Sequence, residues 1–227
     1  MRSDRYYTLM ASLPALEPLF AEELPPCSRF RLEKRLEMLE PEDARDLAAL
    51  EGVMFFDRLS FDLTDRAIVE DTERVMSTIR SPLLREVAEW RMSLRTVVAA
   101  LRRRATGGPP PKPGEKWGFG WWTRALERNW GRRDFGLTGA LPWIETFAGL
   151  VERGDALELE KEVLDLVWMY LSRRAEGHYF DLEAVALYVL RWDLLRRRTS
   201  QDAAEARQRF DELMEASWGT FAGELQV

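Results

Sequence analysis

Apolar residues recur at steps of three and four over much of the chain, and the most regular stretch begins at Ser81 and Pro82. A serine N-cap followed by proline in the first turn favours the start of a helix at this point. The helix is expected to end in the basic segment Arg102–Arg104, where positive charges complement the helix dipole. Its apolar stripe comprises Leu83, Val87, Trp90, Leu94, Val97 and Leu101.

The stretch from Tyr179 to Arg198 is predicted to be the central core helix. Asp181 suits the N-cap position, because its carboxylate can accept hydrogen bonds from the free N–H groups of the first turn. The residues that follow are apolar nearly all round the helix, which is typical of a helix packed on several sides. Tyr179 and Phe180 are expected to pack beneath the capped end, and Arg196–Arg198 end the helix with positive charge.

Similar caps and apolar spacings predict further helices, and no stretch predicts a large sheet. Residues 6–14 fit either a short strand or a first helix. The fold class is therefore all-α, a multi-helix array of about nine or ten helices. The further helices are predicted over residues 28–40, 40–56, 64–79, 117–129, 141–151, 155–175 and 199–214.

The Gly/Pro-rich segment 106–116 is the one clear interruption of the helical pattern. It is interpreted as a surface loop or a linker. It separates an N-terminal helical part, residues 1–105, from a C-terminal helical part, residues 117–227, that is rich in tryptophan. This pattern is compatible with two separate domains and also with one continuous domain.

Composition narrows the function classes. The chain has 227 residues, and its 33 basic and 39 acidic side chains give a net charge of −6, which disfavours a general nucleic-acid-binding protein. Its single cysteine excludes an intramolecular disulfide, and its single histidine removes most zinc sites and Ser-His-Asp triads. The longest uncharged run, residues 6–16, contains Pro14 and is far shorter than the roughly 20 apolar residues of a membrane span. Without a signal-peptide pattern, we expect a cytoplasmic protein whose membrane association, peripheral to the inner membrane, is made through partners.

Three stretches contain residue types that occur in catalytic, metal or nucleotide sites. Gly118-Phe119-Gly120 lacks the remaining residues of a dinucleotide or phosphate loop. His178, with Asp181 and Glu183, can be an acid–base site or a helix-capping corner, and we favour the capping corner. The third stretch is a set of four carboxylates, which suggests either a metal site or a solvated acidic face. Its even spacing favours the acidic face, because such positions do not share one side of a helix. This set is Glu158, Glu160, Glu162 and Asp165. We therefore expect no catalytic residues, no cofactor and no metal ligands.

Two arginine triplets and one tryptophan pair are the candidate partner contacts. The triplets could contact RNA, phospholipid or an acidic protein surface, although dipole complementarity alone also explains arginines at helix ends. The tryptophan pair follows the Gly/Pro-rich segment, and exposed aromatic side chains often anchor interfaces. The candidates are Arg102, Arg103, Arg104, Trp121, Trp122, Arg196, Arg197 and Arg198.

Two segments resemble known families. The sequence Tyr6–Pro14 resembles the tyrosine-rich opening, ending in Ala-Ser-Leu-Pro, of an uncharacterised bacterial family encoded among V/A-type ATPase subunits. The later segments Asn129-Trp130, Asp134–Leu137, Pro142-Trp143 and Tyr179–Val185 are similar to that family too. The C-terminal part is also similar, more distantly, to the helix pairs of the rotor-socket subunit of these ATPases, called C in bacteria and d in eukaryotes. That subunit contains three similar helical units, whereas this chain is shorter and shows no triplication.

The resemblance implies a non-enzymatic accessory or central-stalk-associated subunit of this ion-transporting ATPase. Its partners would be stalk or membrane-ring subunits, with no nucleic acid and no small-molecule substrate. Two alternatives remain open. One is a helical enzyme that uses the carboxylates at 158–165 with a divalent cation, and the other is an RNA- or lipid-binding adaptor that uses the arginine triplets.

Overall fold

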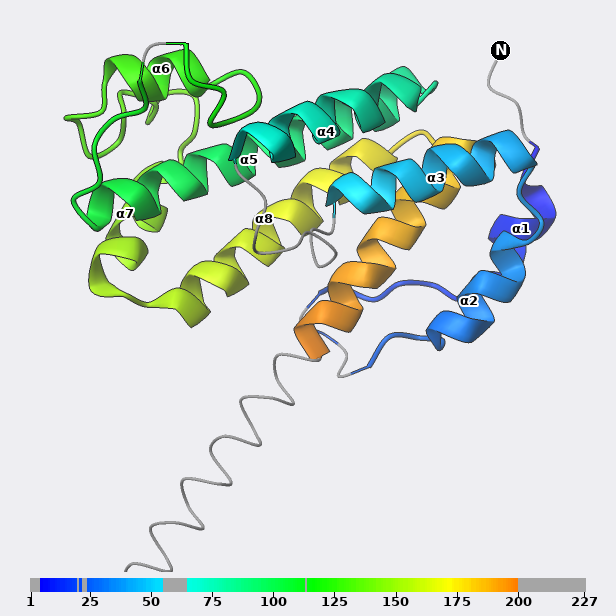
Figure 1. Cartoon of the computed structure of the whole chain (residues 1–227). Helices are drawn as coiled ribbons and strands as arrows, with labels where there is room; N and C mark the ends of the chain where they lie inside the picture. Colours follow the sequence, from blue (N-terminus) through cyan, green and yellow to red (C-terminus); the bar gives the residue numbers. More distant parts are fainter. Residues whose placement is uncertain (1–4, 20, 22–23, 55–64, 113, 200–227) are drawn as a thin grey trace, which may run out of the picture.

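The computed structural model describes residues 5–19, 21, 24–54, 65–112 and 114–199, and within these ranges it contains helices and no strand (Figure 1). The predicted all-α fold class is therefore confirmed. Eight labelled helices are followed by a ninth, which spans residues 182–199 of the described chain. The labelled helices are α1 (Tyr7–Ser12), α2 (Arg29–Leu36), α3 (Pro41–Met54), α4 (Asp65–Thr78), α5 (Pro82–Ala105), α6 (Thr123–Arg128), α7 (Ile144–Arg153) and α8 (Ala156–Ala175).

The long helices α5 and α8 run between the two ends of the molecule. In Figure 1, α6 and α7 lie at one end, and α1 and α2 lie at the other. Helix α3 packs against α4 and α5, α5 also contacts α6 and α7, and α7 contacts α8. No helix in the described ranges is long and apolar enough to cross a membrane.

The helix over residues 182–199 lies in the centre of the core, as predicted. Every residue from Ala184 to Leu190 is buried, and Trp192 is only 1% exposed. The indole Nε1 of Trp192 donates a hydrogen bond to the carbonyl oxygen of Cys27, 3.1 Å away. Buried apolar side chains from both sides of segment 106–116 belong to one cluster, for example Leu50 and Phe147. The division into two parts stays a prediction.

The caps predicted from sequence form as expected. The Ser81 hydroxyl accepts a hydrogen bond from the Leu84 N–H at 3.3 Å at the start of α5, and Pro82 occupies the first turn. Asp155 accepts from the Glu158 N–H at 3.3 Å at the start of α8. The predicted stripe of α5 is buried except for Leu83 and Trp90, which are half-buried. These local i, i+3 contacts explain why the sequence places both helix starts correctly.

The N-terminal segment forms a helix, which resolves the choice left open at residues 6–14. The Tyr6 N–H donates to the Phe180 carbonyl oxygen at 2.8 Å, and the rings of Tyr7 and Phe180 are 4.7 Å apart. Near the end of the same segment, the Tyr188 hydroxyl donates to the Pro14 carbonyl oxygen at 2.9 Å. The N-terminal and C-terminal segments that carry the family resemblance therefore contact each other directly.

The helix predicted over residues 117–129 is shorter than expected, because α6 begins only at Thr123. A Cβ on Gly120, whose φ is +96°, would lie 1.8 Å from the Ser93 hydroxyl oxygen. The Phe119 N–H donates to Thr96 Oγ1 at 2.9 Å. The two glycines of Gly118-Phe119-Gly120 thus allow the backbone to approach α5 closely, and this tertiary contact replaces the first helical turns.

Other boundaries differ from the expected ones. Helix α2 ends at Leu36, four residues before the predicted end at Glu40, and the apolar side chain of Phe30 on this helix is 68% exposed. Tyr179, expected beneath the cap, is also exposed. Thr199 lies inside the helix over 182–199, where it does not act as a cap. The remaining predicted features lie outside the described residues: the Thr64 cap, the end of the third helix at Phe56, and a last helix over 200–214.

Candidate functional site

Three arginines follow one face of α5 and line a hollow, here named the arginine hollow. Arg91, Arg95 and Arg102 are separated by four and seven residues, which places them on the same side of the helix. Arg197, from the helix over 182–199, joins them across a space of about 720 Å³. Glu160 is the single acidic residue among those described that line it. The rest of the lining is apolar and consists of Met54, Val98, Ala99, Leu159 and Val163.

The arginines of the hollow are crowded by like charge. The pKa of Arg91 is lowered to about 10, mainly by burial and also by the positive charges of Arg95 and Arg197. Burial also lowers the pKa of Arg95, while the charge of Asp65 opposes the change. Partial removal from water makes each positive charge more costly, so a negative charge in the hollow would stabilise the group.

Each predicted arginine triplet contributes one residue to this hollow, namely Arg102 and Arg197. The other four make local contacts. The Arg103 guanidinium lies 5.9 Å from the Trp130 ring centroid, and Arg104 is 3.5 Å from a Glu152 carboxylate oxygen. Arg196 is 3.4 Å from Asp193, and Arg198 donates to the Leu19 carbonyl oxygen. The structure therefore brings the two triplets together through one member of each.

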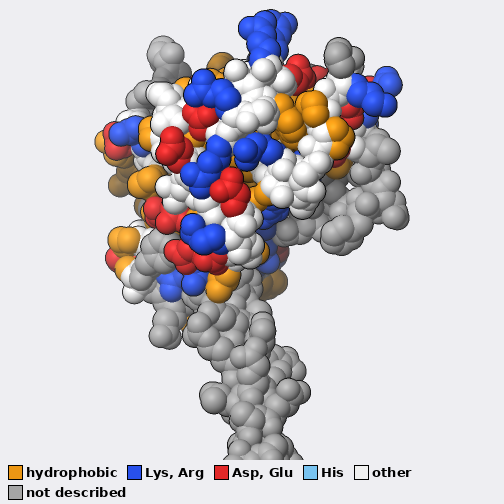
Figure 2. Space-filling view, turned by 90° about the vertical axis from the view of Figure 1, so that its left-hand side faces the viewer, with side chains coloured by type: hydrophobic (Ala, Val, Ile, Leu, Met, Phe, Trp, Pro, Cys, Tyr) orange, Lys and Arg blue, Asp and Glu red, His pale blue; other side chains and the backbone are white. Residues whose placement is uncertain are grey.

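The two candidate tryptophans differ in exposure. Trp121 is 52% exposed, whereas Trp122 is half-buried and packs against the core. The Trp121 N–H donates to the Ser93 hydroxyl at 3.4 Å, which fixes the backbone of the exposed residue against α5. At the end of the molecule that carries α6 and α7, basic and acidic side chains are intermixed, with apolar side chains between them (Figure 2). This face therefore presents no broad field of one sign.

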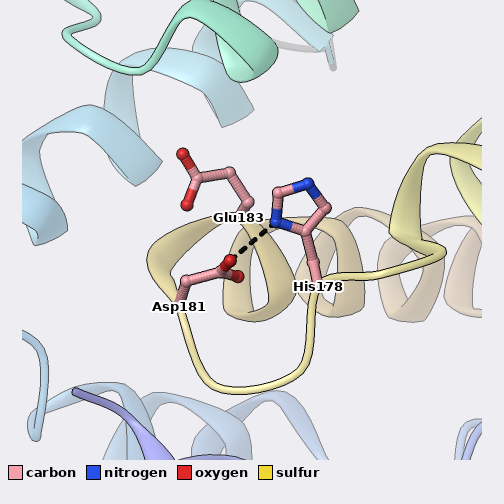
Figure 3. A group of neighbouring side chains, drawn as sticks. All are labelled: His178, Asp181 and Glu183. Carbon is pink, nitrogen blue, oxygen red and sulfur yellow. Dashed lines mark hydrogen bonds and ion pairs between the residues drawn. The ribbon is translucent and has the colours of Figure 1, made fainter. Parts of the chain in front are cut away.

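A second polar site lies where the connector after α8 meets the helix over 182–199. His178 Nδ1 is 2.7 Å from Asp181 Oδ2, and Asp181 Oδ1 accepts the Ala184 N–H at 2.9 Å (Figure 3). Glu183 accepts a hydrogen bond from the Ser81 hydroxyl at 2.7 Å. One ligand atom from each of His178, Asp181 and Glu183 lies within 4.8 Å of the others. We name these three residues the His178 cluster.

Around the His178 cluster is a hollow of about 480 Å³ that reaches α3. Arg80 spans its far side and contacts Glu42 at 2.5 Å, Asp43 at 2.6 Å and Asp46 at 3.2 Å. The Tyr6 hydroxyl donates to Asp43, and burial together with this bond raises the pKa of Tyr6 to about 12. Arg80 is thus engaged by the carboxylates of α3.

The helix-capping interpretation of His178 and Asp181 agrees with these contacts, since Asp181 accepts the Ala184 N–H. The structure adds Glu183, which Ser81 holds beside them. The four carboxylates at 158–165 do not converge in this way: three are exposed, and none belongs to the group of ligand atoms that meet in the described ranges. Sequence reasoning also missed Arg91 and Arg95, although their spacing from Arg102 is a readable helical signal.

Replacing Asp181 by alanine is expected to lower the free energy of unfolding by about 1–2 kcal/mol. The change removes the cap of the core helix and leaves His178 without its carboxylate. Urea denaturation followed by circular dichroism measures the effect. The matched control is Asp155→Ala, which removes an exposed cap from α8 and should cost about 0.5–1 kcal/mol. Equal stability of Asp181→Ala and the unmodified protein would contradict the capping role.

No protein-family model matches the chain, and neither a curated protein nor a solved structure is significantly similar to it.

Proposed function

We propose that this chain is a non-enzymatic accessory or central-stalk-associated subunit of a V/A-type ATPase, and that it binds an acidic surface of a partner subunit through the arginine hollow. Two features support the proposal. Two of the segments that resemble the ATPase-associated family, Tyr6–Pro14 and Tyr179–Val185, lie in direct contact. One candidate arginine from each triplet, Arg102 and Arg197, lines the same hollow.

The observation that carries the proposal is the convergence of four arginines from two helices around one hollow, in which Glu160 is the single acidic residue among the described residues of the lining. Arginine is suited to carboxylate recognition, because its planar guanidinium can donate two parallel hydrogen bonds. Burial and the neighbouring charges of Arg95 and Arg197 lower the pKa of Arg91, and carboxylates of a partner would offset both effects. Charge complementarity of this kind mainly determines specificity and the rate of association.

A protein partner fits the charge distribution better than RNA or an anionic lipid surface. The net charge of the chain is −6, and the face shown in Figure 2 mixes both signs. Nucleic-acid-binding proteins usually carry an extended basic patch. Four arginines line the arginine hollow, and its apolar walls suit an inserted side chain or loop.

The carboxylates at 158–165 give the enzyme alternative no geometric support. Glu158, Glu160 and Glu162 are exposed, and Glu160 faces the arginine hollow. A catalytic divalent cation requires several ligand atoms directed to one point. A binding role for this part of α8 is therefore favoured.

Affinity purification from membranes that contain a V/A-type ATPase tests the proposal. The tagged chain should recover stalk or ring subunits, identified by mass spectrometry. Arg102→Glu should reduce the recovery at least about tenfold, which corresponds to about 1.4 kcal/mol. Arg173→Glu is the matched control, because Arg173 is also an exposed arginine in the last turn of a helix but does not line the hollow. Absence of ATPase subunits from the unmodified sample would contradict the proposal.

A further inference from the structure

The His178 cluster combines one imidazole nitrogen with two carboxylates. These are the ligand types that bind zinc and manganese in proteins. The ligand atoms lie within 4.8 Å of one another, and Figure 3 shows the three side chains gathered at one point. The cluster opens onto the hollow of about 480 Å³, which leaves room for water to complete a coordination shell.

The cluster contributes two carboxylates to a hollow that is also lined by Arg5, Arg80, Asp43 and Asp46. Asp181 is only 6% exposed, and its ion pair is with His178, which contributes positive charge only when protonated. Glu183 is held by the neutral hydroxyl of Ser81. Arg80, which lines the same hollow, is committed to the three carboxylates of α3. Two carboxylates that are partly removed from water and close to each other are stabilised by a nearby positive charge.

The ligands are held from several directions. Asp181 Oδ1 is fixed by the Ala184 N–H, while Oδ2 points to His178. Glu183 is oriented by Ser81, the N-cap of α5. Groups of this kind around a metal site orient its ligands and contribute to its affinity.

We propose that the His178 cluster binds a divalent cation of the zinc or manganese class through His178 Nδ1 and the carboxylates of Asp181 and Glu183. Metal binding replaces the hydrogen bond between His178 Nδ1 and Asp181 Oδ2. The imidazole then carries its proton on Nε2, so that the Nδ1 lone pair faces the metal. The cation is structural. It joins the connector after α8 to the start of the core helix, whose Glu183 contacts Ser81 at the N-cap of α5. This site is independent of the arginine hollow and of any ATPase partner.

Isothermal titration calorimetry tests the site on the full chain after treatment with a chelator. Zinc chloride and manganese chloride should each bind with one-to-one stoichiometry and raise the melting temperature. Loss of even an outer partner of a metal site costs 10–100-fold in affinity, so His178→Ala and Glu183→Gln should each weaken binding at least about tenfold. Glu183→Gln is the milder change, because its amide oxygen can still accept from Ser81.

The matched control is Glu162→Gln, which removes an exposed carboxylate of α8 from the alternative acidic set and should leave the affinity unchanged. The proposal is overturned if the unmodified chain shows neither heat nor a change in melting temperature at millimolar metal. It is equally overturned if Glu183→Gln and His178→Ala bind the metal as tightly as the unmodified chain.

Discussion

Replacing Trp192 by alanine is expected to lower the free energy of unfolding by about 3–5 kcal/mol. The side chain is 1% exposed and is among the largest that are fully buried in the described chain. Its removal leaves a cavity in the core helix and deprives the buried Cys27 carbonyl oxygen of its donor. Both losses act in the same direction, so this is the largest expected effect of a single substitution.

Urea denaturation of the two proteins measures this loss directly. The matched control is Trp121→Ala, which removes a 52% exposed indole and should change stability by no more than about 0.5 kcal/mol. If Trp192→Ala unfolds at the same urea concentration as the unmodified chain, the placement of the helix over 182–199 at the centre of the core is wrong.

One buried carboxyl group, Asp193, is expected to contribute less to the free energy of unfolding as the pH rises from about 4 to about 6. The pKa of Asp193 is raised from 3.8 to about 6, mainly by burial and also by the negative charge of Glu51. Arg29 and Arg196 lie 3.5 Å and 3.4 Å from this carboxylate, and their charges oppose the increase without cancelling it. The folded chain therefore holds this proton more tightly than the unfolded chain does.

A carboxyl group whose pKa is higher in the folded state contributes most to stability at low pH. Its contribution decreases as the pH rises from the unfolded pKa to the folded pKa, and it is constant above that range. For Asp193 the decrease is on the order of 2–3 kcal/mol. Asp193→Asn removes this proton equilibrium and leaves the other titrating groups in place. The stability of Asp193→Asn relative to the unmodified chain should thus increase by a similar amount from pH 4 to pH 7.

Chemical denaturation at pH 4, 5, 6 and 7 gives this difference at each pH. The unmodified chain is the control, because the subtraction removes the contributions that both proteins share. A stability difference that is the same at all four pH values would show that Asp193 does not titrate in this range.

The sequence predicted those parts of the fold that depend on near neighbours along the chain. Ser81, Asp155 and Asp181 all cap helices through contacts three residues away, and these contacts form as expected. The uninterrupted apolar run 184–190 likewise predicted a central helix, because a helix that is apolar nearly all round must be buried on several sides.

Contacts between distant segments limited the same reasoning. The backbone at Gly120 packs against Ser93, and this contact shortened a helix that the local pattern predicted. At the N-terminus, the hydrogen bond from Tyr6 to Phe180 joins residues that are far apart in sequence. Local periodicity contains no information about either contact, so helix boundaries near them were wrong or undecided.

The candidate sites show the same difference between local spacing and contacts that join distant segments. Arg91, Arg95 and Arg102 share one helix face, so their alignment is readable from spacing alone. The approach of Arg197 to that face requires the packing of two helices, and the meeting of Glu183 with Ser81 requires a contact across 102 residues. The sequence therefore indicated Arg102 and Arg197 as candidates, but it did not indicate that they meet, and Arg91 and Arg95 were missed.

The most direct test of the proposed function is a titration of the purified chain against a purified V/A-type ATPase at physiological salt. The account predicts saturable binding by the unmodified chain and by Arg173→Glu, with binding at least about tenfold weaker for Arg102→Glu. Absence of saturable binding by the unmodified chain, or equal binding by the two variants, would contradict the assignment of the arginine hollow as the partner-binding surface.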